Sequence, residues 1–194
     1  MIQKLFTTVL LALCISAGMG QTTKTSHRSL NRKLTIEPAI GMSLFGNDGL
    51  RFSTIIQRNT EKKLSFISHT SLSPGLMTFV REDVKQNYSY SLAQKIGIGA
   101  SFYTKKMVNS YSFIAGLKYS AYSGTLQNDE IPETITTKTS SVSSEYGMMY
   151  NLKLGKGKCF FSTRVYIPLK DGIYGLGEDS SFEFGLGIRV KSKP

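Results

Sequence analysis

Apolar and polar residues alternate along most of the chain, most clearly near its C-terminal end. In SSFEFGLGIRV, residues 180–190, Phe, Phe, Leu, Ile and Val occupy every second position, with Glu, Gly, Gly and Arg between them. A period of two places successive side chains on opposite faces of a β-strand. The same alternation, bounded by turn residues, recurs along the chain, and no segment shows a helical period. The eight predicted strands cover residues 34–45, 50–59, 64–73, 87–103, 109–126, 139–154, 158–169 and 179–191.

The predicted connections alternate between short turns and longer loops. Short turns follow the second, fourth and sixth strands, at residues 60–63, 104–108 and 155–157. Longer loops follow the third, fifth and seventh strands, at residues 74–86, 127–138 and 170–178, and a tight hairpin at 46–49 follows the first. Each predicted strand reaches the ~9–11 residues that a tilted membrane strand needs. The pattern predicts an all-β fold, an eight-stranded antiparallel up-and-down transmembrane β-barrel.

The composition of the polar face indicates which face lies inside. It combines isolated long charged side chains with many Gly and Ser. The interior of an eight-stranded barrel is only wide enough for side chains to fill, so small residues make room for long ones. Tyr and Phe near the strand ends are typical of aromatic girdles at membrane interfaces. These aromatic residues are Tyr88, Tyr90, Phe102, Tyr103, Tyr111, Tyr119, Tyr146 and Phe160.

We therefore expect the apolar face to meet lipid and the charged face to line the lumen. An exported, soluble, lipocalin-like ligand-binding barrel, with its apolar face inside, is the alternative. In the membrane barrel, we expect the charged residues of the lumen to form an ion-pair network, in which Arg164 pairs with Glu183 on the next strand. Lys153 also lies on the face that lines the lumen. The members of the network are Glu37, Arg51, Lys95, Lys118, Glu145, Arg164, Glu183 and Arg189. Positive charges outnumber negative ones, so an anion path or a small-ligand site is the second interpretation of this lumen.

The first residues of the chain predict export. Lys4, an apolar run and the small residues before Gln21 form a secretory signal over residues 1–20. Residues 21–33 then form a flexible periplasmic lead-in, and residues 34–191 the barrel domain. Only Cys159 remains after the signal, so the mature chain has no internal disulfide. The net charge of +11 is not gathered into one basic patch, and an exported protein with dispersed charge is not expected to bind nucleic acid.

Charge also separates the two predicted ends of the barrel. Lysines, among them Lys62, Lys105 and Lys156, dominate the short turns. Acidic residues dominate the loops at the other end, which include Glu82 and Asp171. We expect the basic turns in the periplasm and the acidic loops at the cell surface, with residues 128–141 as the contact surface for an unidentified partner.

The strand count, the turn pattern and the closing FEFGLGIRV resemble the small bacterial outer-membrane barrels of the OmpA/OmpX type, especially eight-stranded families of Bacteroidota. The resemblance covers residues 34–191 and implies a place in the bacterial outer membrane. It also implies contact with outer-membrane lipid, lipopolysaccharide and the barrel-assembly machinery, and a structural or surface-interaction role. Such proteins usually end on an aromatic residue that the assembly machinery reads, whereas this chain continues with KSKP. Phe182 and Phe184 are the candidates for that signal here.

One segment suggests chemistry. In SHTS, residues 68–71, His69 and Ser71 share a face of the third strand and Glu82 follows, which is the composition of a hydrolytic triad. Outer-membrane lipid A deacylases look similar in carrying His-x-Ser followed by Glu. A lipid A deacylase-like hydrolase is therefore an alternative to the expected non-enzymatic role. The sequence shows no metal-ligand spacing and no phosphate-binding loop, and we expect no metal and no cofactor.

Overall fold

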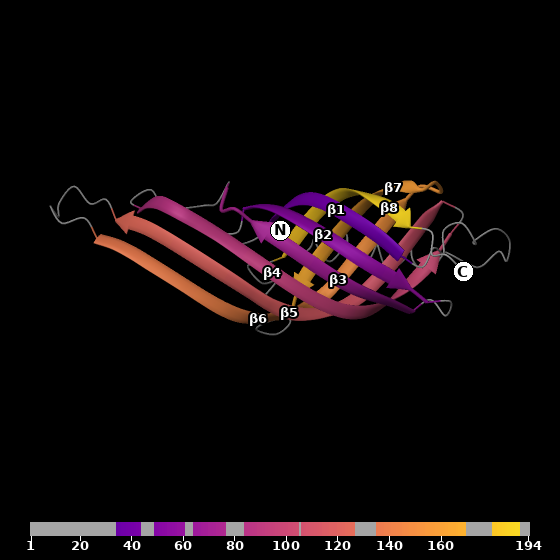
Figure 1. The fold of residues 1–194 in the computed structure, drawn as a ribbon, viewed down its shortest axis with the longest axis horizontal. Helices are drawn as coiled ribbons and strands as arrows, with labels where there is room; N and C mark the ends of the chain where they lie inside the picture. The colour runs from indigo at the N-terminus through magenta and orange to yellow at the C-terminus, as the bar shows by residue number, and fades with distance from the viewer. Residues whose placement is uncertain are drawn as a thin grey trace, which may run out of the picture.

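The computed structural model describes residues 34–43, 49–60, 64–76, 84–104, 106–126, 135–169 and 180–190 (Figure 1). The predicted signal and lead-in, residues 1–33, lie outside the described residues. Within the described ranges, no helix is long and apolar enough to cross a membrane.

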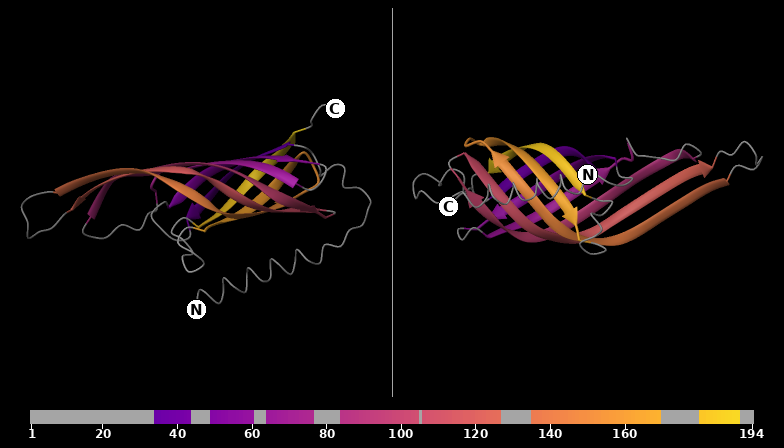
Figure 2. Two further views of the ribbon diagram at one scale, coloured as in Figure 1. Left: turned by 90° about the horizontal axis from the view of Figure 1, so that it is seen from below. Right: turned by 180° about the vertical axis from the view of Figure 1, so that it is seen from behind.

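Eight antiparallel strands form one closed barrel in which each strand pairs with its neighbours in sequence and β8 closes on β1 (Figure 2). The predicted eight-stranded antiparallel barrel is thereby confirmed. The strands are β1 (Leu34–Ser43), β2 (Leu50–Asn59), β3 (Leu64–Ser73), β4 (Val84–Tyr103), β5 (Met107–Leu126), β6 (Ile135–Leu154), β7 (Cys159–Pro168) and β8 (Ser181–Val190).

Three strands are twice as long as the others. β4, β5 and β6 have 20 residues each, against 10 in each remaining strand. The pairing of β3 with β4 stops at Ser91, and the pairing of β6 with β7 begins at Gly147. Beyond those residues the three long strands pair only with one another among the described residues. They project from one end of the barrel as a three-stranded sheet (Figures 1 and 2).

We call residues 84–90, 120–126 and 135–141 the extension. Residues 84–86 were predicted as part of a loop but belong to β4. Residues 139–141 were predicted to begin the sixth strand, and that is confirmed, but the loop predicted for residues 135–138 and the contact loop predicted for residues 128–141 are wrong for residues 135–141. They lie in β6 and pair with residues 120–126 of β5. The hydroxyls of Thr125 and Thr136 are 3.1 Å apart across the two strands, and the amide of Asn87 donates to Thr125 at 2.9 Å. Cross-strand polar contacts of this kind hold strands together without an apolar face.

The face that lies inside the barrel is the polar one. In β8, Glu183 and Arg189 are each 1% exposed, while Leu186 on the other face is 68% exposed. β2 and β3 show the same alternation, with most of their polar positions buried and most of their apolar ones exposed; Arg58 and Thr70 are the exposed polar residues. A lipocalin-like barrel requires the opposite arrangement, so the burial pattern opposes that alternative.

Two residues assigned to the aromatic girdles point inward instead. Phe160 is 3% exposed and packs in the lumen, and the hydroxyl of Tyr103 is buried. Both share the parity of inward-facing residues, Ser162 in β7 and Ser101 in β4. The prediction was made from their position near strand ends, whereas strand parity decides the face.

Candidate functional site in the barrel lumen

All eight residues of the predicted ion-pair network are buried inside the barrel. The register brings them together in rows that cross the strands. Lys95 of β4, Gly116 of β5 and Glu145 of β6 form one such row, with glycine in the middle. Because Gly116 has no side chain, Lys95 and Glu145 meet across β5, with 2.5 Å between Nζ and Oε2. Lys118 Nζ lies 3.7 Å from the other carboxylate oxygen of Glu145.

Glu37 is the centre of a second cluster and is fully buried. Its carboxylate forms an ion pair with Lys153 and accepts hydrogen bonds from Thr35 Oγ1 at 2.6 Å and Asn151 Nδ2 at 2.7 Å. Lys153 Nζ also donates to Gln57 Oε1 at 2.8 Å. A buried charge is tolerated when it is paired and its remaining hydrogen-bonding positions are satisfied, and this cluster meets both conditions.

Glu183 is the centre of a third cluster. Arg164 Nε lies 3.4 Å from Glu183 Oε2, and the hydroxyls of Ser53 and Ser181 donate to the same carboxylate at 2.5 and 3.2 Å. His69 Nε2 is 4.0 Å from Glu183 Oε1. The predicted pair of Arg164 and Glu183 is thus present, as direct register partners on β7 and β8.

Arg164 links the second and third clusters. Besides its contact with Glu183, its Nη2 donates to the backbone oxygen of Glu37 at 2.7 Å. Asn151 is its register partner on β6 and donates to the carboxylate of Glu37. Four strands of the barrel wall are therefore tied together through one set of charged side chains.

Arg51 and Arg189 have other contacts. Arg51 Nε donates to Ser73 Oγ at 3.4 Å. Arg189 donates to the backbone oxygens of Gly157 at 2.6 Å and Gly155 at 2.9 Å, in the turn between β6 and β7. Its guanidinium carbon lies 4.4 Å from the centre of the Phe160 ring, a favourable cation–π distance. Arg189 therefore fixes a turn at one end of the barrel.

Apolar side chains fill another part of the lumen. Ile55, Ile67, Ile114, Met149 and Tyr166 are buried and pack as one cluster. The sequence prediction named only polar residues for this face and missed the cluster. The signal was available, because each of these residues has the parity of its charged or polar neighbours. Together with the three charged clusters, they pack the interior with side chains.

The candidate catalytic residues His69 and Ser71 both face the lumen, at 0% and 4% exposure. Neither ring nitrogen of His69 makes a hydrogen bond to a described residue, so the histidine does not engage the Ser71 hydroxyl. Glu82 lies outside the described residues, and the carboxylate recorded near His69 belongs to Glu183. Within the described part of the chain, no group of three His, Cys, Asp or Glu residues could hold a metal ion.

No family model matches the chain, and no curated protein matches it. Among solved structures, the barrel is similar to the N-terminal β-barrel domain of Pseudomonas aeruginosa OprF. The identity is 11%, the alignment covers 81% of this chain and 97% of that domain, and the TM-score is 0.47.

Proposed function

We propose that the chain is a bacterial outer-membrane β-barrel protein, with a side-chain-filled lumen and a surface-interaction role carried by the extension. The observation that carries the proposal is the inverted burial of the barrel. Charged residues are sealed inside, while large apolar side chains such as Ile96 and Leu186, each 68% exposed, cover the outside. A soluble protein rarely exposes so continuous an apolar surface, whereas a barrel in lipid requires one.

Two groups of aromatic rings support a membrane placement. Tyr90 and Tyr119 contact each other near the base of the extension, with ring centres 5.9 Å apart. Tyr111 contacts Tyr150 at 5.0 Å nearer the other end. Along β5, Tyr111 and Tyr119 are separated by ~27 Å of strand at ~3.4 Å per residue. With strands tilted by ~40° this is ~20 Å along the barrel axis, close to the ~25 Å apolar band of outer-membrane barrels.

The extension is the part of the protein best suited to meet a partner. Its β6 residues 135–141 are exposed, and most of them are Thr or Ser. Among the described residues, the outer edge of β6 has no strand partner before Gly147, apart from the bond between Leu169 N and Tyr146 O. An unpaired strand edge offers backbone donors and acceptors to another protein. The acidic residues of the loops that were predicted to face the surface, Glu82 and Asp171 among them, lie outside the described residues.

The proposal assigns no catalytic step. A lipid A acyl ester would have to reach His69 and Ser71 through a lumen in which both side chains are buried. Ion pairs and hydrogen bonds account for the three charged clusters, and packing accounts for the apolar cluster, without a substrate. The same filling of the lumen supports a barrel that does not conduct.

Cysteine labelling on intact cells tests the placement and the orientation together. Cys159, the one cysteine outside the predicted signal, is first changed to serine. Single cysteines are then introduced by Thr139→Cys in the extension and by Lys156→Cys in the turn after β6, both of them exposed positions. A membrane-impermeant maleimide should label the Thr139→Cys protein on intact cells and the Lys156→Cys protein only after lysis.

Labelling in the reverse pattern contradicts the orientation, and labelling of neither protein before lysis contradicts surface exposure.

The interaction role is tested by a trimmed variant in which an Asn-Gly turn replaces residues 122–139. Ala121 and Ser140 are register partners, so a two-residue turn can join them. Cells with this variant should keep a folded barrel and lose attachment to other cells or to protein-coated surfaces. Unchanged attachment argues against a role for the extension.

A further inference from the structure

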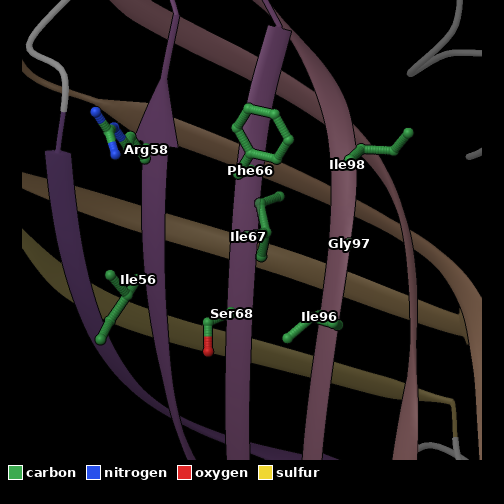
Figure 3. Close-up of a pocket in the computed structure, with 8 residues that line it drawn as sticks. All are labelled: Ile56, Arg58, Phe66, Ile67, Ser68, Ile96, Gly97 and Ile98. Carbon is green, nitrogen blue, oxygen red and sulfur yellow. The ribbon is translucent and has the colours of Figure 1, made fainter.

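The outer wall of the barrel has a hollow among its apolar side chains. It crosses β2, β3 and β4 and has a volume of about 420 Å³ (Figure 3). Two rows of register partners form it. One row is Arg58, Phe66 and Ile98, and the other is Ile56, Ser68 and Ile96.

The hollow exists because Ser68 is the small residue in a row of large ones. In Figure 3, its short side chain lies between those of Ile56 and Ile96, which are its register partners on either side. Phe66 and Ile98 form the adjoining wall and are 49% and 56% exposed. An apolar depression of this kind on an outward face gains stability when an apolar group of fitting shape occupies it.

The polar atom in the hollow does not call for a polar ligand. Ser68 Oγ accepts a hydrogen bond from Gln94 Nε2 at 2.9 Å, and Thr70 donates to the oxygen of the same amide. These groups satisfy one another within the wall, so the surface offered by the hollow is mainly that of isoleucine and phenylalanine. A hydrocarbon chain fits this chemistry better than a polar side chain of another protein.

One end of the hollow carries a positive charge. Arg58 is exposed and precedes Asn59, the last residue of β2, at the barrel end with the short basic turns. Among the described residues, no acidic side chain forms an ion pair with Arg58. An arginine at the edge of the apolar band keeps its stem on the apolar surface and its guanidinium at the headgroup level. Guanidinium groups bind phosphate oxygens through two parallel hydrogen bonds.

We infer that the hollow binds an anionic glycerophospholipid, with one acyl chain beside Ser68 and the phosphate on Arg58. The inference rests on the proposed membrane placement and orientation, since it locates the lipid in the periplasmic leaflet. The charge at one end and the apolar surface beyond it match the two parts of such a lipid. The site would hold one anionic lipid against β2, β3 and β4, while the rest of the wall contacts lipids without preference for their headgroups.

The absence of tryptophan from the chain makes a direct test possible. Phe66→Trp places one fluorophore at the hollow, and Phe161→Trp places one on β7 as the matched reference. Both phenylalanines are exposed, and each lies two residues after the start of its strand. The full-length variants are inserted into phosphatidylcholine vesicles in which a growing fraction of the lipid is brominated phosphatidylglycerol. Quenching by bromine then gives the affinity of each position for the anionic lipid relative to phosphatidylcholine.

At the hollow the relative affinity should exceed that of the reference position by about fivefold, the ratio equivalent to ~1 kcal/mol for one cation beside an anionic lipid. Adding Arg58→Gln to Phe66→Trp should reduce it to the reference value, whereas Arg58→Lys should keep most of it. Ser68→Leu fills the hollow and should also lower it, while Thr163→Leu, an outward position on β7, should not. Heat-modifiable migration on a gel verifies that each variant is folded.

Equal affinities at the two positions, unaffected by Arg58→Gln, overturn the inference. So does a fluorophore at position 66 that brominated phosphatidylglycerol does not quench at any fraction while the one at position 161 is quenched, since a protein surface would then cover the hollow. If neither fluorophore is quenched, the barrel is not in the bilayer, and the proposed function fails together with the site.

Discussion

Breaking the ion pair of Glu37 and Lys153 tests whether the charged clusters stabilise the barrel as coupled units. Glu37→Gln leaves the buried ammonium of Lys153 without a counter-charge, although its hydrogen bonds to Gln57 at 2.8 Å and Thr35 at 3.2 Å remain. Lys153→Met leaves the Glu37 carboxylate with its bonds from Thr35 and Asn151. Because these bonds persist, each single change should cost about 3 kcal/mol, the lower end of the range for breaking a buried pair.

The double variant Glu37→Gln, Lys153→Met leaves neither charge uncompensated and should cost no more than one single change, about 3 kcal/mol, instead of the ~6 kcal/mol expected from simple addition. The difference is a coupling energy of about 3 kcal/mol. Urea-induced unfolding of the protein in lipid vesicles, followed by gel migration, gives the free energies of unfolding. Lys156→Met in an exposed turn is the control and should change the stability by less than about 0.5 kcal/mol. Additivity of the two single changes within about 0.5 kcal/mol refutes the reasoning, because it shows that the two charges do not interact.

Further outcomes follow from the same geometry. Gly116→Val places a side chain between Lys95 and Glu145, where an added Cβ meets the backbone oxygen of Gln94, and should destabilise the barrel by about 1–3 kcal/mol in the same unfolding assay. The cycle of Arg164 and Glu183 should likewise be non-additive. Overexpression of the wild type should leave the lipid A mass spectrum unchanged, whereas loss of an acyl chain that depends on His69 and Ser71 would revive the hydrolase alternative. Protease added to intact cells should cut within residues 127–138 and spare Lys105 and Lys106. Cleavage at those lysines would show that the orientation is the reverse of the predicted one or that the chain is not in the membrane.

The alternation of side chains along each strand was the basis for most of the correct predictions from the sequence, namely the strands and their inward-facing residues. β2 and β3 begin and end at the predicted residues, and the alternation of charged and apolar positions in β8 gives the inward face. Parity also gives the inward orientation of Lys95 and Glu145. It does not give their contact, which depends on the register of both with Gly116 and so on the closed barrel as a whole.

The extension could not be predicted for a related reason. Residues 135–141 are Ile, Thr, Thr, Lys, Thr, Ser and Ser, with no apolar face to mark a strand. They are strand because β5 continues beside them, and Thr125 of β5, which accepts a hydrogen bond from Asn87, is the polar partner of Thr136. An alternation search detects strands that bury one face, and both faces of this part of β6 are exposed. The contacts of Asn151 with Glu37 and of Gln57 with Lys153 could not be predicted, because both residues are uncharged and an amide can face the lumen without touching an ion pair.

The central claim, a polar interior and an apolar wall in the outer membrane, is tested most directly by fractionation combined with gel migration. The account predicts that the full-length protein sediments with outer membranes, stays there in alkaline carbonate, and is released by detergent in a form that migrates differently before and after boiling. Recovery of the protein from the periplasm without detergent, with the same migration before and after boiling, would contradict it.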